Sequence, residues 1–239
     1  MEKSDPRYQA YIQILKEELI PAMGCTEPIA LAYAGAVAKK TLGEQPDKVK
    51  VEASGSIIKN VKSVIVPNTG HLKGINAAVT AGIVAGNPDK QLEVIAQVSP
   101  EQIQQMKQFM EDVPIEIEHL AGGCTFDIIV TVYHGEDYAK VRIANYHTNI
   151  VLVEKNGKVL RSEAVSDDSE DGLTDRTLLD MEHIWDFATT VDISDVKELL
   201  DQQISCNVAI AEEGLKNDYG ANIGKVLLDM DGDDVRVRA

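Results

Sequence analysis

The stretch PAMGCTEPIA, residues 21–30, decides how the first part of the chain folds. A helix with an apolar face over residues 6–20 precedes it, and the Gly-Cys step then turns the chain into a second helix that begins at Thr26. Thr26 suits the N-cap of this helix and Glu27 suits the positive end of its dipole. Pro28 suits a first helical turn because its missing N–H donor would be unpaired there. We therefore predict two helices joined by a turn that holds a cysteine.

Cys25 lies at the predicted start of the second helix, which we expect to run to about Gly43. A thiolate is stabilised at a helix N-terminus and the thiol pKa falls there, whereas a structural cysteine is usually buried among apolar neighbours. The position makes Cys25 a candidate functional residue. The helix itself is rich in small residues, which would let another backbone approach closely. These residues are Ala30, Ala32, Ala34, Gly35, Ala36 and Ala38.

The pattern after this helix predicts an α+β fold, in which an antiparallel sheet packs with Ala/Gly-rich helices and a helical C-terminal segment follows. Alternating and β-branched apolar runs predict the strands, and Asn156-Gly157 is typical of a tight β-hairpin. The expected strands cover residues 49–53, 60–67, 114–120, 126–133, 138–146, 150–154 and 159–161. Helices are expected over residues 72–85 and, capped by Ser99-Pro100-Glu101, to about Met110.

An acidic run at residues 163–175 indicates a solvated linker. It would divide an α+β domain at residues 1–162, which holds the cysteine loop, from a helical segment at residues 176–239. The alternating residues 235–239 read as a strand that is only beginning where the sequence ends.

Two helices are expected in the C-terminal segment. The first would turn Ile184, Trp185 and Phe187 inward. The second, capped by Asp192, carries a long apolar line, and Cys206 is expected to pack on it as a small hydrophobe.

Composition limits the classes of partner. The chain has 239 residues, 23 of them basic and 39 acidic, for a net charge of −16. Phosphate binding needs clustered Lys and Arg, so this balance argues against nucleic acid or an anionic membrane as partner. No apolar run approaches the length of a membrane span, and the start does not resemble a signal peptide. The three cysteines, at 25, 124 and 206, form no CxxC pair and suit a reducing cytoplasm.

Polar residues between apolar runs mark two further candidate sites. Asn68, Thr69 and Gly70 stand between a predicted strand and a helix, an arrangement that aims backbone N–H groups at an anion such as a carboxylate. The alternative is a turn with a helix cap. His147-Thr148-Asn149 lies at a strand-to-strand connection, where a lone histidine is more often a hydrogen-bonded loop residue than a base.

The remaining polar and sulfur-bearing positions receive simpler interpretations. Gly123-Cys124-Thr125 echoes the Gly-Cys-Thr step at residues 24–26, but Gly-Gly before a strand is typical of an ordinary loop, and we assign Cys124 to one. His71 is interpreted as a surface or cap residue. Asn207 lies on an apolar helix, where an amide is costly unless it is paired.

Several of these motifs together resemble the iron–sulfur L-cysteine desulfidase family, relatives of the α chain of bacterial L-serine dehydratase. The matching steps are Gly24-Cys25-Thr26-Glu27-Pro28, a Val-Pro-x-Thr-Gly step ending at Gly70, His147-Thr148-Asn149-Ile150, and residues 207–224. The resemblance extends over nearly all of this sequence, but it covers only the N-terminal half of the family's proteins. The half that follows in the family carries further cysteines of the iron–sulfur site. The resemblance therefore implies a truncated chain or one part of a split enzyme.

The resemblance implies a lyase that eliminates across the Cα–Cβ bond of L-cysteine or L-serine and yields pyruvate and ammonia, with sulfide from cysteine. In the complete enzyme a [4Fe–4S] cluster held by three cysteines would bind the substrate thiol or hydroxyl. The implied catalytic residues are Cys25, Glu27 and His147, with Cys25 as cluster ligand or as acid/base. The implied substrate-binding residues are Asn68, Thr69, Gly70, Thr148, Asn149 and Asn207.

On this basis the chain alone is expected to hold no cluster and to be inactive, with a C-terminal half or a homo-oligomer as partner. A competing hypothesis is a non-catalytic small-molecule-binding or assembly domain. A thiol hydrolase that uses Cys25 and His147 is a third alternative.

Overall fold

The computed structural model describes residues 1–165 and 173–231. The chain forms two compact units, Ala22–Ser169 and a second unit that combines Met1–Pro21 with Glu170–Ala239. Helices and a six-stranded, mostly antiparallel sheet confirm the α+β fold. The expected division differed, since it placed the N-terminal helix with the sheet domain. Among the described residues, no helix is long and apolar enough to cross a membrane.

The sheet of the Ala22–Ser169 unit has the strand order β2-β1-β3-β4-β5-β6. The strands are β1 (Lys48–Ala53), β2 (Ile115–His119), β3 (Asp127–His134), β4 (Asp137–Ala144), β5 (Ile150–Lys155) and β6 (Lys158–Ser162). Every neighbouring pair is antiparallel except β1 and β2, which run parallel. The predicted β5–β6 hairpin is present, with positive φ at Asn156 (50°) and Gly157 (78°), as a tight turn of this kind requires.

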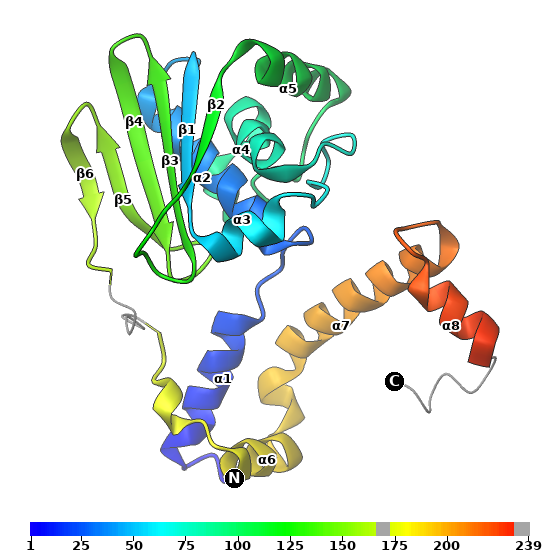
Figure 1. Cartoon of the computed structure of the whole chain (residues 1–239). Coiled ribbons are helices and arrows are strands. Elements are labelled where there is room, and N and C mark those ends of the chain that lie inside the picture. Colours follow the sequence, from blue (N-terminus) through cyan, green and yellow to red (C-terminus); the bar gives the residue numbers. More distant parts are fainter. Residues whose placement is uncertain (166–172, 232–239) are drawn as a thin grey trace. The chain divides into compact units, whose positions relative to one another are not determined.

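Helices pack against the sheet of this unit (Figure 1). Most residues of α2 and of α4 are buried. The helices are α2 (Thr26–Leu42), α3 (Gly55–Val61), α4 (Gly74–Ala85), the 3₁₀ segment η1 (Pro88–Glu93) and α5 (Pro100–Asp112). Strand β1, and β4 over residues 138–143, alternate between half-buried and buried residues, as expected when one face of a sheet is covered. A Cβ atom on Gly82 of α4 would lie 1.8 Å from the carbonyl oxygen of Ala32, so the close backbone approach predicted for α2 is confirmed.

One predicted strand is wrong. Residues 60–67 do not form one, because the chain enters α3 at Gly55 and afterwards makes only an isolated bridge between Ile65 and Lys73. Ile57 and Val61 are both buried, and their spacing of four residues places them on one side of a helix. The predicted cap of α5 is confirmed as a capping box between Ser99 and Gln102.

The second unit is helical. It contains α1 (Pro6–Glu18), the 3₁₀ segment η2 (Arg176–Leu178), α6 (Met181–Thr190), α7 (Ile193–Lys216) and α8 (Ile223–Asp231). Its core joins α1 to α6: Phe187 makes edge-to-face ring contacts with Tyr8 and Tyr11, with centroids 5.6 and 5.3 Å apart. Asp192 caps α7, as predicted.

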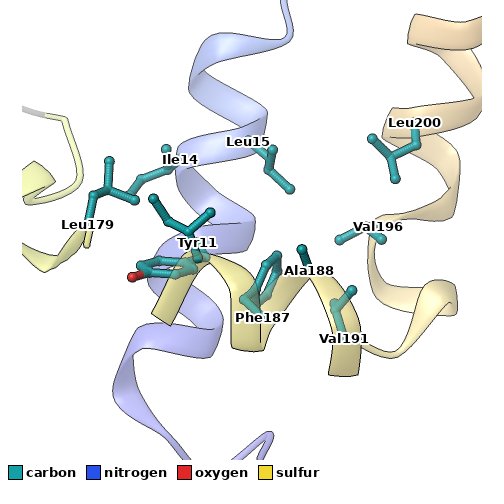
Figure 2. Close-up of a pocket in the computed structure, with 10 residues that line it drawn as sticks. Tyr11, Ile14, Leu15, Leu179, Phe187, Ala188, Val191, Val196 and Leu200 are labelled. Atoms are coloured by element: carbon teal, nitrogen blue, oxygen red, sulfur yellow. The ribbon is translucent and has the colours of Figure 1, made fainter. Parts of the chain in front are cut away.

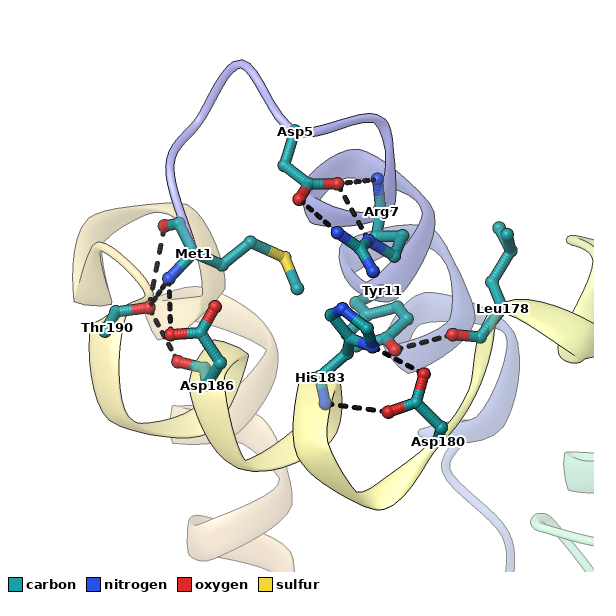
Figure 3. A network of polar contacts seen from close by, with 9 residues as sticks. All are labelled: Met1, Asp5, Arg7, Tyr11, Leu178, Asp180, His183, Asp186 and Thr190. Atoms are coloured by element: carbon teal, nitrogen blue, oxygen red, sulfur yellow. Dashed lines mark hydrogen bonds and ion pairs between the residues drawn. The ribbon is translucent and has the colours of Figure 1, made fainter.

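Polar contacts close the same unit at the chain's start (Figure 3). The amino group of Met1 forms an ion pair with Asp186 at 2.8 Å and also contacts the Thr190 hydroxyl. The Tyr11 hydroxyl donates to the carbonyl oxygen of Leu178 at 2.7 Å. Together with the aromatic contacts, these bonds explain why α1 belongs with the C-terminal helices.

Three expectations for the C-terminal helices are corrected. Phe187 is buried, but Trp185 is 72% exposed and Ile184 is 38% exposed. Residues two positions apart lie on nearly opposite sides of a helix, so Trp185 faces away when Phe187 faces α1. Cys206 is exposed on α7 and is not packed as a small hydrophobe. The strand expected at residues 235–239, and residues 166–172 of the expected linker, lie outside the described residues.

Candidate functional site

The cysteine loop ends on Cys25, which is the N-cap of α2 and is exposed. Gly24 turns the chain there with a φ of 111°, which side chains rarely adopt. Thr26 is therefore the first helical residue and not the N-cap, which corrects the prediction. Its hydroxyl is left available for a contact outside the helix.

The Thr26 hydroxyl makes that contact with His147. Thr26 Oγ1 and His147 Nε2 are 2.9 Å apart, which joins the start of α2 to the connection between β4 and β5. The ring of Phe126, just before β3, lies against the imidazole with the centroids 4.4 Å apart. His147 is half-buried by these neighbours.

Glu27 connects the cysteine to a third element. Its carboxylate accepts a hydrogen bond from the Cys25 thiol, with Sγ 3.1 Å from Oε2. The other oxygen, Oε1, accepts from the Asn60 side-chain amide at 3.3 Å. Asn60 lies in the last turn of α3. The cluster therefore joins three segments: the start of α2, the end of α3 and the loop that holds His147.

The electrostatics of this cluster differ from the prediction for Cys25. Partial burial and the hydrogen bond to the Glu27 carboxylate raise the pKa of the Cys25 thiol, whereas a lowered pKa was expected from the helix N-terminus. The same bond from Cys25 lowers the pKa of Glu27. Burial lowers the pKa of His147, partly offset by the charge of Glu27. At neutral pH the cluster therefore holds a protonated thiol, a carboxylate and a neutral imidazole.

The Asn68-Thr69-Gly70 loop begins next to the cysteine loop, since a Cβ on Gly24 would lie 3.7 Å from Cγ of Pro67. Its side chains serve the loop itself. The Asn68 amide donates to the carbonyl oxygens of Ile95 and Ala96 at 3.1 and 3.4 Å. The fully buried Thr69 hydroxyl donates to the carbonyl oxygen of Val66 at 2.8 Å. The side-chain donors of Asn68 and Thr69 are thus already paired within the fold. Gly70 is exposed with a φ of 65°, so the groups that this loop presents to solvent are backbone groups.

The other candidate residues divide between the two compact units. Thr148 and Asn149 follow His147 and are half-buried, and the Asn149 amide donates to the carbonyl oxygen of Ala144 at 3.0 Å, which closes the loop. Asn207 belongs to the helical unit. Asn207 is exposed, and its side-chain amide donates to the carbonyl oxygen of Gln203 at 2.8 Å. The hydrogen-bond partner expected for this amide is therefore a backbone group of the same helix.

Sequence reasoning missed Asn60 and Phe126 as members of this cluster. The four-residue spacing of Ile57 and Val61 would have indicated α3 and so brought Asn60 into view. Nothing in the sequence marks Phe126 as the neighbour of His147, because their contact depends on how the strands pair.

A buried ion pair supports the loop that carries Phe126. The Arg142 guanidinium donates twice to the Asp127 carboxylate, at 2.9 and 2.6 Å, and Asp127 is fully buried. The Ser54 hydroxyl donates to the carbonyl oxygen of Thr125 at 2.7 Å. Both bonds hold the chain at the start of β3, where Cys124 also lies.

In the described parts of the chain, no group of three or more His, Cys, Asp and Glu side chains is placed to hold a metal ion. Cys25 is exposed and offers a single sulfur. The described residues around Cys25 therefore do not by themselves make up the three-cysteine site that the family's iron–sulfur cluster requires.

Comparison with known proteins adds one finding. No protein-family model and no solved structure matches the chain. Curated proteins do match along its whole length. The chain is similar to UPF0597 proteins.

The UPF0597 protein of Desulfitobacterium hafniense is 53% identical over all 239 residues, which make up 56% of that relative. The UPF0597 protein of Lachnoclostridium phytofermentans is 44% identical over 97% of this chain and 55% of the relative. That of Fusobacterium nucleatum is 42% identical over 98% of this chain and 56% of the relative. The chain thus spans a little over half the length of the UPF0597 relatives that it matches.

Proposed function

We propose that this chain supplies the acid and base of a lyase that eliminates across the Cα–Cβ bond of L-cysteine or L-serine. The observation that carries the proposal is the Thr26–His147 bond, because it brings a neutral imidazole to the helix start that holds Cys25 and Glu27. The family resemblance of the Gly-Cys-Thr-Glu-Pro and His-Thr-Asn-Ile steps supports the same reaction class.

The protonation states suit the two proton transfers of an elimination. With Nε2–H donating to Thr26 Oγ1, the neutral His147 imidazole would keep its lone pair on Nδ1 and accept the Cα proton there. The protonated Cys25 thiol would donate a proton to the departing thiolate or hydroxide, and the Glu27 carboxylate that accepts its hydrogen bond holds it in place. The electron pair of the Cα–H bond becomes the Cα–Cβ double bond as the Cβ–S or Cβ–O bond breaks. Hydrolysis of the resulting aminoacrylate gives pyruvate and ammonium.

An iron–sulfur cluster belongs to this proposal only for the complete protein. Its other ligands would come from the part of the relatives that lies outside this chain. The hydrogen bond from the Cys25 thiol to the Glu27 carboxylate supports the acid role for this residue.

The test uses one polypeptide in which this chain is continued by the remaining part of the Desulfitobacterium relative, prepared without oxygen and supplied with iron and sulfide. Pyruvate and sulfide released from L-cysteine, and pyruvate from L-serine, are measured. We expect Cys25→Ala and His147→Asn to lower turnover by about 100-fold or more, as loss of a general acid or base does. Cys206→Ala, which removes an exposed thiol on α7, is the matched control and should keep full activity.

Wild-type turnover in Cys25→Ala and His147→Asn would overturn the assignment of these residues. Binding of L-cysteine or L-serine with no product would instead favour the non-catalytic binding domain.

A further inference from the structure

Among the described residues of the helical unit, α7 and α8 carry an apolar surface that is exposed. Along α7, apolar residues recur every three or four positions, which keeps them on one side of the helix. Three of them are largely open to solvent: Ile204 is 57% exposed, Val208 49% and Leu215 45%. The following helix α8 adds Ile223, Val226, Leu227 and Met230, which are also exposed. A helix face that is normally buried is thus left open over several turns.

This surface continues into a groove between α1, α6 and α7 (Figure 2). The groove encloses about 400 Å³ and its lining is apolar apart from the Tyr11 hydroxyl. Val196 and Leu200 line it from α7, and Ile204 and Val208 follow them at intervals of four residues on the same side of the helix. We name the groove together with Ile204, Val208 and Leu215 the apolar docking face.

We propose that the apolar docking face binds the part of the full-length relatives that lies outside this chain, through an apolar, helix-sized surface of that part. The Desulfitobacterium relative matches over 56% of its length, so 44% of it (100 minus 56) has no counterpart here. A region of that size is large enough for a further domain with its own core. Apolar surfaces of this extent on soluble proteins mark interaction sites.

Two other occupants fit the observations less well. A second copy of this chain would bring a net charge of −16 against an equal charge, and like charges oppose association. A small apolar ligand would fill the groove between α1, α6 and α7 but would leave Ile204, Val208 and Leu215 in water. An occupant as long as α7 covers both parts at once.

The test measures how accessible the face is, independently of any catalytic activity. Ile204→Cys lies on the face, and Gln202→Cys lies on the opposite side of α7 as the matched control. Each variant is labelled with a maleimide in this chain alone and in the continued polypeptide that includes the rest of the Desulfitobacterium relative. Labelling at each position is followed by peptide mass spectrometry, which separates it from the native cysteines.

We expect labelling at position 204 to slow at least about tenfold in the continued polypeptide, and labelling at position 202 to stay within about twofold, because only the face becomes covered. Equal rates at position 204 in both proteins would overturn the proposal. Slow labelling at 204 in this chain alone, with a dimer mass by light scattering, would assign the face to a second copy instead. As a second measurement, Ile204→Glu with Val208→Glu should weaken the docking and so speed proteolysis of α7 in the continued polypeptide. Gln202→Glu with Ala209→Glu, on the other side of α7, should leave the rate of proteolysis unchanged.

Discussion

The Thr26 hydroxyl lies 2.9 Å from Nε2 of His147, although the two residues are 121 positions apart in the chain. This bond joins the first turn of α2 to the loop after β4. It orders the imidazole beside the Cys25–Glu27 pair.

Thr26→Val removes the hydroxyl but keeps the side-chain shape. We expect it to lower the free energy of unfolding by about 1 kcal/mol, the usual net contribution of a partly buried hydrogen bond. Urea denaturation measures this, and Thr26→Ser, which keeps the hydroxyl, should retain most of the stability. Equal loss in both variants would show that the methyl group and not the bond is what matters.

The stability of the sheet unit should fall in mild acid because of His147. Burial holds the pKa of His147 below its ordinary value of 6.5, so the unfolded chain takes up a proton first as the pH drops. The contribution of the neutral imidazole is complete above that value and is lost as the pH falls through it towards the folded-state pKa. We expect His147→Gln to lose less stability than wild type between about pH 8 and about pH 5.5, measured by urea denaturation. Parallel pH profiles would contradict this.

Glu27→Gln should make Cys25 more reactive. The carboxylate raises the pKa of the thiol, so its removal leaves more thiolate at neutral pH. We expect alkylation of Cys25 by iodoacetamide near neutral pH to accelerate about two- to fivefold, scored by peptide mass spectrometry. Glu44→Gln, just beyond the end of α2, is the control and should leave the rate unchanged. A slower reaction in Glu27→Gln would mean that the carboxylate activates the thiol.

Gly82→Ala and Gly214→Ala should act in opposite directions. A Cβ on Gly82 would meet the carbonyl oxygen of Ala32 at 1.8 Å, so α2 and α4 would have to separate. We expect a loss of about 3 kcal/mol or more in the free energy of unfolding. A Cβ on Gly214 of α7 meets nothing within 4 Å, and alanine there should stabilise the helix by about 0.5–1 kcal/mol. Thermal denaturation measures both, and a neutral Gly82→Ala would refute the close packing.

Phe187→Ala should destabilise the helical unit alone. It removes the edge-to-face contacts with Tyr8 and Tyr11, and loss of a buried phenylalanine costs about 3–5 kcal/mol. Hydrogen exchange should show lost protection in α1 and α6, with β3 and β4 unchanged. Trp185→Ala, on the exposed side of the same helix, should shift stability by less than about 0.5 kcal/mol. Lost protection in β3 and β4 would show that the two units unfold as one.

The sequence by itself determined the features that depend on neighbouring residues. The small residues of α2, the Ser99–Gln102 cap and the Asn156-Gly157 hairpin all follow from local conformational preference and spacing, and the structure contains each of them. Cys25 was also placed correctly at a helix start. The α+β class follows from the same local signals summed along the chain.

Only the tertiary structure decided which distant segments meet. The contact of Asn60 with Glu27, the ring of Phe126 on His147 and the parallel pairing of β1 with β2 depend on long-range packing, which leaves no local periodicity to detect. The pKa of the Cys25 thiol was predicted in the wrong direction for a different reason. A helix start favours a thiolate, but partial burial and a carboxylate two residues away oppose it, and only the folded chain sets the balance between them.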